Sequence, residues 1–258
     1  MATFGVTMVR DEIDILPFTL AHMMRQCDHV IVADNRSKDG TREYLESLGS
    51  GITLVDDPEV GYRQAEKMTG MALTAFGMGA KWVVPFDADE HWYSPHASRI
   101  ADHVAQFRGY ALLPAEMYDH VPTSLDNESD PNPLTRMGWR RRGPGALPKV
   151  ACAADERLRI HMGNHDADYG RFTGRRVADQ LVIRHYPYRS GEQFVRKAVQ
   201  GAEALRATDL PANVGAHWRQ YAATVEEHGP EALIGHYLTW FYSADPAADE
   251  SLIFDPAP

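Results

Sequence analysis

The chain has 258 residues, and its 26 Lys and Arg against 36 Asp and Glu give a formal net charge of −10. Hydrophobic residues make up 44% of the chain and aromatic residues 10%, a composition typical of a globular protein, which excludes a disordered one. The acidic balance argues against a general binder of polyanions, although a local basic patch stays possible.

The two cysteines, Cys27 and Cys152, are too few for a disulfide framework or a zinc site. A single bridge stays open, but we expect free thiols in a reducing compartment. The first residues lack a charged segment followed by an apolar one, and no apolar run approaches the length of a membrane span. We therefore predict no signal peptide and no transmembrane helix, and we expect a cytoplasmic protein.

The first hundred residues alternate between strand and helix signals. Apolar and β-branched runs predict four strands, at Phe4–Val9, Val30–Val32, Ile52–Val55 and Trp82–Phe86. Between them we expect three helices: one capped by Asp14 and continuing to Cys27, then Thr41–Leu48, then Arg63–Phe76 with a loose point at Gly70. This order is typical of a parallel sheet covered by helices.

The regular alternation of strand and helix signals ends after Pro95. Beyond it we predict a helix at Ser98–Arg108 and strands at Tyr110–Pro114 and Val177–His185. The segment Asp119–Lys149 is rich in proline and is expected to be a long loop, of the kind that acts as a lid over a site.

The last part of the chain is predicted to be mainly helical. Ser190 and Gln193 form a capping box at the start of a helix. Residues 211–242 have helical spacing with several aromatic side chains, and the acidic tail after Asp245 is expected to be frayed.

Three carboxylates, Asp87, Asp89 and Glu90, follow the apolar strand Trp82–Phe86. Ligands of open α/β sheets bind at the carboxyl ends of the strands. Two carboxylates separated by one residue can share Mg²⁺ or Mn²⁺ with phosphate oxygens. The simpler interpretation is a solvated acidic turn.

Two further polar segments follow strand ends. Asp34 opens the segment Asp34–Thr41, where it could accept hydrogen bonds from a nucleobase or a ribose, while Asp39 and Gly40 suit helix capping and a turn. Arg10-Asp11-Glu12 follows the first strand and could bind polar ligand groups, or its acids could simply favour a helix N-terminus.

These three segments, in this order, resemble the inverting glycosyltransferases of the family-2 type, which have the GT-A fold. The likeness covers roughly residues 3–92, with a weaker echo at Gly163–Asp166 and Arg184–Phe194. It implies a GT-A-like (Rossmann-like) α/β fold, with a mostly parallel sheet flanked by helices. It also implies transfer of a sugar from a nucleoside-diphosphate sugar, of UDP or GDP type, to an acceptor hydroxyl.

The resemblance implies a role for each matching residue. Asp34 matches the acid that reads the base, and Asp87 and Asp89 match the pair that holds the metal and the diphosphate, with Asp89 favoured as the direct ligand. The metal implied is Mn²⁺ or Mg²⁺. The remaining residues expected to line the nucleotide pocket are Arg10, Asp11, Glu12, Arg63, Gln64 and Lys67.

A late histidine often completes such a metal site, and His185 suits this role because it lies between a predicted strand and a helix. His165 competes with it. Lys149, Arg189 and Lys197 are further candidates for contact with the diphosphate.

The catalytic base would take a proton from the acceptor hydroxyl. Asp166 and Asp119 are our candidates, with Glu116 behind them. The acceptor is open, with a saccharide, a lipid-linked or a small molecule favoured. Trp139-Arg140-Arg141-Arg142 could bind phosphates with stacking, so that a modified nucleic acid is a minority hypothesis, and a solvated face is the simpler interpretation.

Three different functions compete with sugar transfer. A sugar-1-phosphate nucleotidyltransferase would have a glycine-rich loop after the first strand, and Arg10–Glu12 stands there instead. A catalytically silent binding scaffold and a metal-dependent hydrolase also stay open.

The domain organisation follows from the same pattern. We expect a GT-A-like domain at residues 1–205, with a nucleotide-sugar half at 1–95 and an acceptor half at 96–205. A helical C-terminal extension at 206–258 could serve a homodimer.

Overall fold

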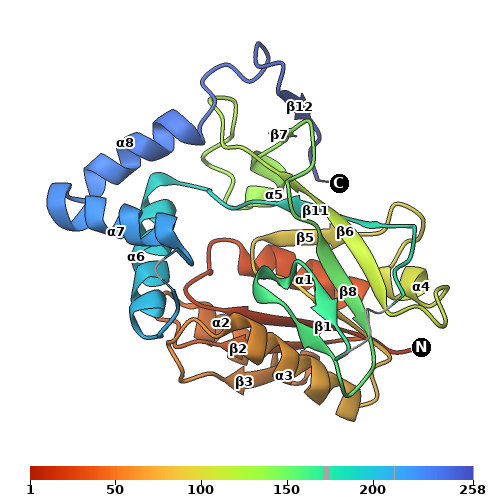
Figure 1. Ribbon diagram of the computed structural model, residues 1–258. Helices are drawn as coiled ribbons and strands as arrows, with labels where there is room; N and C mark the ends of the chain where they lie inside the picture. Colours follow the sequence, from red (N-terminus) through yellow and green to blue (C-terminus); the bar gives the residue numbers. More distant parts are fainter. Residues whose placement is uncertain (171–174, 212, 258) are drawn as a thin grey trace. The chain divides into compact units, whose positions relative to one another are not determined.

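The computed structural model describes residues 1–170, 175–211 and 213–257. The chain folds into two compact units, which are described separately (Figure 1). The first unit comprises Met1–Pro58, Gln64–Tyr118 and Pro144–His185. The second unit comprises Glu59–Arg63, Asp119–Gly143 and Tyr186–Pro258. The predicted division at residue 205 stays a prediction.

The described part of the first unit is built on one sheet of eight strands, in the order β3-β2-β1-β4-β8-β6-β11-β5. The first four are parallel and alternate with helices as predicted. They are β1 (Thr3–Val9), β2 (His29–Asp34), β3 (Thr53–Asp56) and β4 (Trp82–Pro85). The helices between them are α1 (Leu16–Gln26), α2 (Thr41–Ser47) with the 3₁₀ turn η1 (Gly49–Gly51), and α3 (Gln64–Gly77).

The second half of the sheet contains four strands. Two of them overlap the strands predicted at Tyr110–Pro114 and Val177–His185, and the other two, at Glu90–Tyr93 and Lys149–Ala153, were not predicted. The four strands are β5 (Glu90–Tyr93), β6 (Leu112–Asp119), β8 (Lys149–Ala153) and β11 (Leu181–His185). The pairs β4–β8, β6–β8 and β5–β11 are antiparallel, so the sheet as a whole is mixed. Shorter elements complete the unit: α4 (Ile100–Val104), β9 (Arg159–Ile160), η2 (Met162–Asn164) and β10 (Ala167–Asp168).

Both faces of β1, β2 and β4 are buried, which explains their near-continuous apolar runs, while the edge strand β3 is partly exposed. In β2, Val30 and Val32 face one core, shared with α1, α2 and α4, while Ile31 and Ala33 face a second core, shared with α3. β4 divides in the same way, with Val84 in the first core and Val83 in the second. This period of two places successive side chains on opposite faces of the sheet.

Some helix boundaries differ from the prediction. Helix α1 begins at Leu16 after Ile15, with no side-chain cap, so Asp14 does not cap it. The helix expected at Ser98–Arg108 is the single short turn of α4. Helix α3 continues through Gly70 without a break. Packing of α3 against the sheet outweighs the low helix propensity of the single residue Gly70.

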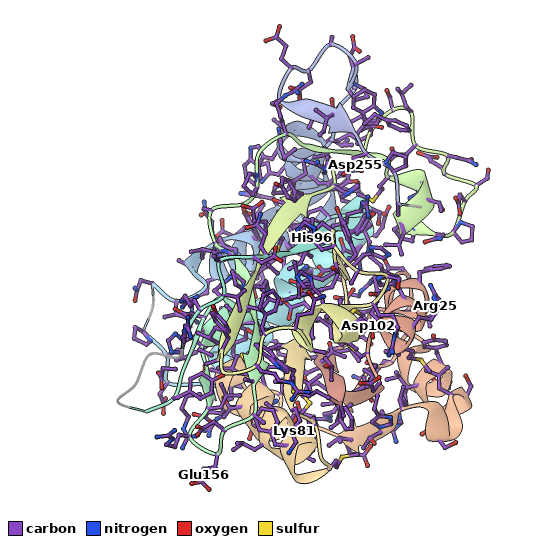
Figure 2. The ribbon with its side chains drawn as sticks, turned by 90° about the vertical axis from the view of Figure 1, so that its right-hand side faces the viewer. Arg25, Lys81, His96, Asp102, Glu156 and Asp255 are labelled. Carbon is purple, nitrogen blue, oxygen red and sulfur yellow. The ribbon has the colours of Figure 1, made fainter. Side chains whose placement is uncertain are left out.

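Arg99 joins α1 to the segment before α4. Its guanidinium donates to the carbonyls of Arg25 at 3.0 Å and Cys27 at 3.1 Å, and to the Asp28 carboxylate at 2.9 Å. These carbonyls belong to the end of α1, where intrahelical partners are lacking, so the cation satisfies them and complements the helix dipole. Arg25 and Asp102 are labelled in this region of Figure 2.

The second unit contains three consecutive helices and a small sheet. The helices are α6 (Gly191–Arg206), α7 (Ala216–His228) and α8 (Pro230–Trp240), and α5 (Pro133–Arg136) is a further short one. Ser190 caps α6 by accepting from Gln193 N at 3.1 Å, as predicted. Phe194, Leu233 and Tyr237 form the core of this helical group, against which Trp218, Tyr221 and Phe241 pack.

The tail after Asp245 is not frayed, contrary to the prediction. Its residues Leu252–Phe254 form β12, which pairs antiparallel with β7 (Trp139–Arg141). Arg140 donates to Asp255 at 2.6 Å, and Arg142 donates to the carbonyls of Glu250 and Leu252. The acidic tail therefore occupies guanidinium donors of the basic cluster that the sequence offers as a candidate for nucleic-acid binding.

We predict a pH-dependent contribution of His22 to stability. Its Nε2 lies 2.7 Å from the Trp92 carbonyl, and its ring stacks on His91 with centroids 3.7 Å apart. Burial lowers the pKa of His22 below its ordinary value of 6.5. Below that pH the unfolded chain binds a proton that the folded chain resists, so this contribution is present above pH 6.5 and is lost as the pH falls.

The His22→Gln variant keeps a donor for the carbonyl but does not titrate. Urea unfolding at about pH 7.5 and about pH 5.5 should therefore show wild type losing more stability than His22→Gln on acidification. An equal loss in both proteins would contradict the prediction.

Candidate active site

The parallel strands place several carboxylates at one edge of the sheet. Asp34 ends β2, and Asp87 follows β4 by two residues. In the strand order β3-β2-β1-β4, the chain moves outward from β1 to β3 and then returns to the other side of β1. Such a reversal creates the crevice in which ligands of open α/β sheets bind. The predicted placement of Asp34 and Asp87 at strand ends is observed.

A buried lysine organises the acids after β4. Lys149 of β8 is 3% exposed, and its Nζ lies 2.6 Å from Asp87 Oδ2 and 2.8 Å from Glu90 Oε1. Burial acts to lower the pKa of Lys149, but the charges of Asp87 and Glu90 outweigh it and raise that pKa. Lys149 is therefore the internal counter-ion of this acidic segment.

Glu90 is fully buried and belongs to the scaffold of the site. Its Oε2 accepts from Asp87 N at 3.0 Å and from Trp92 Nε1 at 2.8 Å. Burial raises the pKa of Glu90, and the Lys149 charge opposes this. The sequence marks Glu90 only as the residue after the D-x-D pattern, because its partner Lys149 is remote along the chain.

The other carboxylate oxygen of Asp87 accepts from two side-chain amides. Gln64 Nε2 and Asn164 Nδ2 each lie 3.2 Å from Asp87 Oδ1. Gln64 is also fixed at its other end, where Oε1 accepts from Gly163 N at 2.9 Å. The predicted pocket residue Gln64 thus joins Asp87 to the Gly163–Asp166 segment.

Asp89 faces a different partner. It is 4% exposed, and its Oδ1 lies 3.7 Å from His185 Nε2. The antiparallel register of β5 and β11 sets His185 opposite Glu90, which brings the ring beside the preceding Asp89. His165 instead contacts the Pro148 carbonyl through Nδ1 at 3.0 Å, and burial lowers its pKa.

The loops after β1 and β2 hold one another. Asp11 N donates to Ser37 Oγ at 3.0 Å, and Glu12 N donates to Thr41 Oγ1 at 3.0 Å. Asp34 is 5% exposed, and its Oδ1 accepts from Ser37 N at 3.3 Å. Arg10 and Glu12 lie on the loop after β1. The hydrogen bonds hold this loop against the loop that follows Asp34.

Lys67 lies at the neighbouring strand end. Its Nζ is 2.6 Å from Asp57 Oδ2, and Asn35 Nδ2 donates to the same oxygen at 2.9 Å. Asn35 directly follows Asp34 at the end of β2, so Asp57 connects Lys67 to that strand end. Sequence reasoning missed Asp57, which follows β3 without any motif.

The other predicted residues have different partners or belong to the second unit. Asp166 accepts from Arg176 and from Ala167 N, and its side chain is 42% exposed. Glu116 accepts from Tyr118 Oη at 2.8 Å. Arg63 and Asp119 belong to the second unit.

Among the described residues, no group of three or more His, Cys, Asp or Glu side chains is placed so that it could hold a metal ion. Cys27 and Cys152 are buried and unbridged, as expected. Among the helices of the described segments, none combines the length and apolarity needed to cross a lipid bilayer.

Residues 6–154 match the model of glycosyl transferase family 2, which is more than half of the chain. The chain therefore belongs to that family and is a glycosyltransferase. The α/β fold with helices on both faces of the sheet and a helical C-terminal segment is the GT-A-like fold that the resemblance implied.

Solved structures of one bacterial protein also align with the chain. S. aureus TarS 1-349 in complex with UDP is 13% identical, with a TM-score of 0.43, over 93% of this chain and 72% of that one. Another S. aureus TarS structure is 14% identical, with a TM-score of 0.45, over 93% of this chain and 44% of that one. No curated protein matches the chain.

The Lys149 ion pairs give a prediction for stability. Lys149→Met leaves Glu90 as an uncompensated buried charge, and we expect it to lower the free energy of unfolding by about 3 kcal/mol. Adding Glu90→Gln removes that charge, so the double variant should be more stable than Lys149→Met. Urea unfolding measures both.

The matched control is Lys81→Met, since Lys81 is an exposed lysine of the same unit (Figure 2). It should change the free energy of unfolding by no more than about 0.5 kcal/mol. If Lys149→Met were as stable as Lys81→Met, the ion pairs would not support the site.

Proposed function

We propose that this glycosyltransferase moves a sugar from a nucleoside-diphosphate sugar to an acceptor hydroxyl, with a divalent metal and with inversion at the anomeric carbon. The observation that carries the proposal is the set of carboxylates Asp34, Asp87 and Asp89, which lie at or just after strand ends where the strand order reverses. A donor of UDP or GDP type would place its nucleoside toward Asp34 and its diphosphate toward the acids after β4.

The residues present fit a divalent cation with shared ligands. Asp89 Oδ1 and His185 Nε2 lie 3.7 Å apart and could both contribute to Mn²⁺ or Mg²⁺, with oxygens of the donor completing the shell. Asp87 suits this role less, because Lys149, Gln64 and Asn164 already engage its oxygens. When bound, the metal would neutralise charge on the leaving nucleoside diphosphate.

The chain's own residues would perform the remaining chemistry. The acceptor oxygen bonds to the anomeric carbon from the face opposite the diphosphate, and the bond from that carbon to the phosphate oxygen breaks. A carboxylate takes the acceptor proton. Asp166 is the proposed base, with Asp119 and then Glu116 next in order. Asp166 is accessible enough to meet an acceptor, since its side chain is 42% exposed.

The compartment belongs to the same proposal. Cys27 and Cys152 are kept as buried free thiols, which supports a reducing environment such as the cytoplasm.

Donor binding is testable by thermal unfolding with UDP, GDP, CDP, ADP and TDP, each with and without Mn²⁺. Ligand at about 100 times its Kd stabilises by roughly 2.7 kcal/mol, which should raise the Tm by about 5–10 °C. One nucleotide should give a Mn²⁺-dependent rise that Asp89→Asn abolishes.

The control is Asp102→Asn, an exposed acid of α4, which should keep the full shift. If no nucleotide raises the Tm of wild type, the proposed donor pocket is wrong, and a silent scaffold becomes the better account.

The base is tested by turnover. Asp166→Asn should slow nucleotide release from the identified donor by about 10²-fold or more, in the presence of acceptor, while the nucleotide-induced Tm shift is unchanged. Asp168→Asn, in the same segment, serves as control because Asp168 bonds to His161 and Gly170 N. A wild-type rate for Asp166→Asn would transfer the assignment to Asp119.

A further inference from the structure

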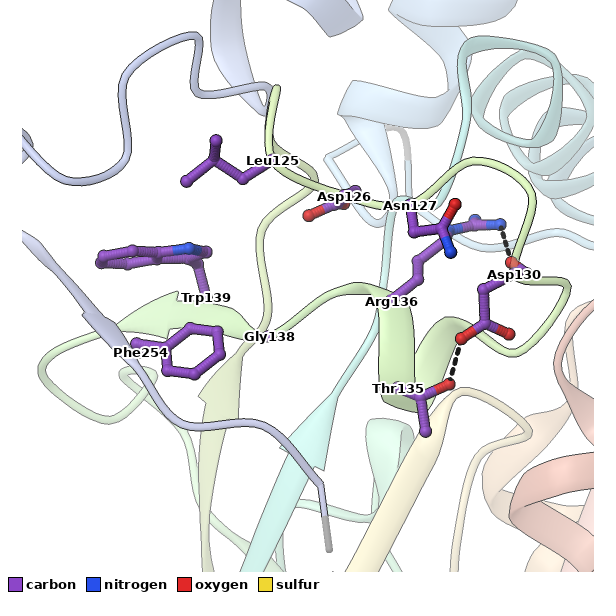
Figure 3. A pocket seen from close by; sticks show the side chains of 9 residues that line it. All are labelled: Leu125, Asp126, Asn127, Asp130, Thr135, Arg136, Gly138, Trp139 and Phe254. Carbon is purple, nitrogen blue, oxygen red and sulfur yellow. Dashed lines mark hydrogen bonds between the residues drawn. The ribbon is translucent and has the colours of Figure 1, made fainter.

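The second unit contains a cavity of about 540 Å³ (Figure 3). It is formed by the segment before α5, by α5 itself, by the start of β7 and by β12. The lining residues are Leu125, Asp126, Asn127, Asp130, Thr135, Arg136, Gly138, Trp139 and Phe254. Its volume lies in the range of small-molecule sites.

One side of the cavity is aromatic and apolar. Trp139 and Phe254 are opposite one another in the β7–β12 pair, with ring centroids 5.5 Å apart. Phe254 and Leu125 are each 64% exposed, so these side chains are not core residues. Figure 3 shows Leu125, Trp139 and Phe254 on the same side of the cavity.

Gly138 allows the Phe254 ring to approach the backbone closely. A Cβ at Gly138 would lie 2.6 Å from Phe254 Cε2, which is closer than van der Waals contact permits. The absence of a side chain there therefore lets the ring lie against the chain beside Trp139. An exposed aromatic ring fixed in this way is available to a ligand rather than to the core.

The other side carries two fixed carboxylates. Asp126 accepts from Thr123 N at 3.1 Å and from Thr123 Oγ1 at 2.7 Å. Asp130 accepts from Asn132 N at 2.9 Å and from Thr135 Oγ1 at 2.6 Å. Each oxygen thus has one internal donor, and a carboxylate can accept about four hydrogen bonds, so both acids are held in place with acceptor capacity to spare.

Arg136 supplies donors on the same side. Its guanidinium reaches the carbonyl of Arg189 at 3.2 Å and, more weakly, that of Asp130 at 3.5 Å. Its charge also acts on the carboxylates of Asp126 and Asp130. The cation is therefore positioned by main-chain oxygens and keeps N–H groups for a ligand.

We propose that this cavity binds a neutral pyranose residue of a saccharide. The C–H face of a sugar ring suits the electron-rich faces of Trp139 and Phe254. Sugar hydroxyls both donate and accept, so they can donate to Asp126 and Asp130 and accept from Arg136. A phosphate would be repelled by the two acids, and a purely apolar ligand would leave them desolvated.

The saccharide is assigned to the acceptor side of the reaction, and this assignment alone rests on the proposed function. The binding chemistry does not, because every residue of the cavity belongs to the second unit. The two ideas therefore fail independently.

The test is saturation-transfer difference NMR on the full chain with maltotriose, cellotriose and triacetylchitotriose, with Kd values from tryptophan fluorescence. At least one trisaccharide should bind with a Kd of about 5 mM or lower. Trp139→Ala and Phe254→Ala should each weaken that binding about tenfold or more. Phe254→Ala guards against misfolding, since Phe254 is largely exposed.

Trp240→Ala is the matched control, because Trp240 is 45% exposed in the same unit but lies on α8, outside the cavity. It should bind like wild type. No binding of any of the three trisaccharides at about 20 mM, or undiminished binding by both cavity variants, would overturn the proposal. Saccharide binding without any nucleotide-induced Tm shift would leave this site standing and refute the proposed donor.

Discussion

The arrangement of the candidate active site depends on one buried cation. Lys149 Nζ joins the acid after β4 to the first residue of β5, and it does so from β8, the strand beside β4. Because the lysine, together with Gln64 and Asn164, engages both oxygens of Asp87, the neighbouring Asp89 is left to face His185. The two acids of the D-x-D pattern therefore have different partners: Asp87 is held by Lys149, Gln64 and Asn164, and Asp89 faces His185.

Backbone strain is concentrated around the same acids. Asp11, Arg36 and Asn164 are the non-glycine residues of the described segments with positive φ, at 55°, 61° and 58°. Asn164 donates to Asp87 through its side chain. Arg36 directly precedes Ser37, which donates to Asp34 and accepts from the backbone N–H of Asp11. Such conformations cost about 1–3 kcal/mol each and persist where surrounding contacts enforce them, which is typical of functional sites.

Local sequence is sufficient to predict the parallel half of the sheet and the approximate positions of β6 and β11, but not β5 or β8. The strands β1, β2 and β4 are buried on both faces, and the acids that follow β2 and β4 lie at strand ends as predicted. The partners of Glu90 and of the arginines in β7 cannot be found in this way. Lys149 and Asp255 are distant in sequence and carry no local pattern, and the pairing of β12 with β7 is set by tertiary contact.

Chain connectivity separates the two proposed binding tasks. The second unit is made of three segments, which begin at Glu59 after β3, at Asp119, the last residue of β6, and at Tyr186 after β11. Strand β8 and the Lys149 ion pairs belong to the first unit. Changes in the segments of the second unit can therefore alter the residues of the cavity while the residues of the Lys149 ion pairs are kept. Under the two proposals, acceptor preference and donor chemistry would then depend on different segments, in line with the general placement of binding residues on connections of a rigid scaffold.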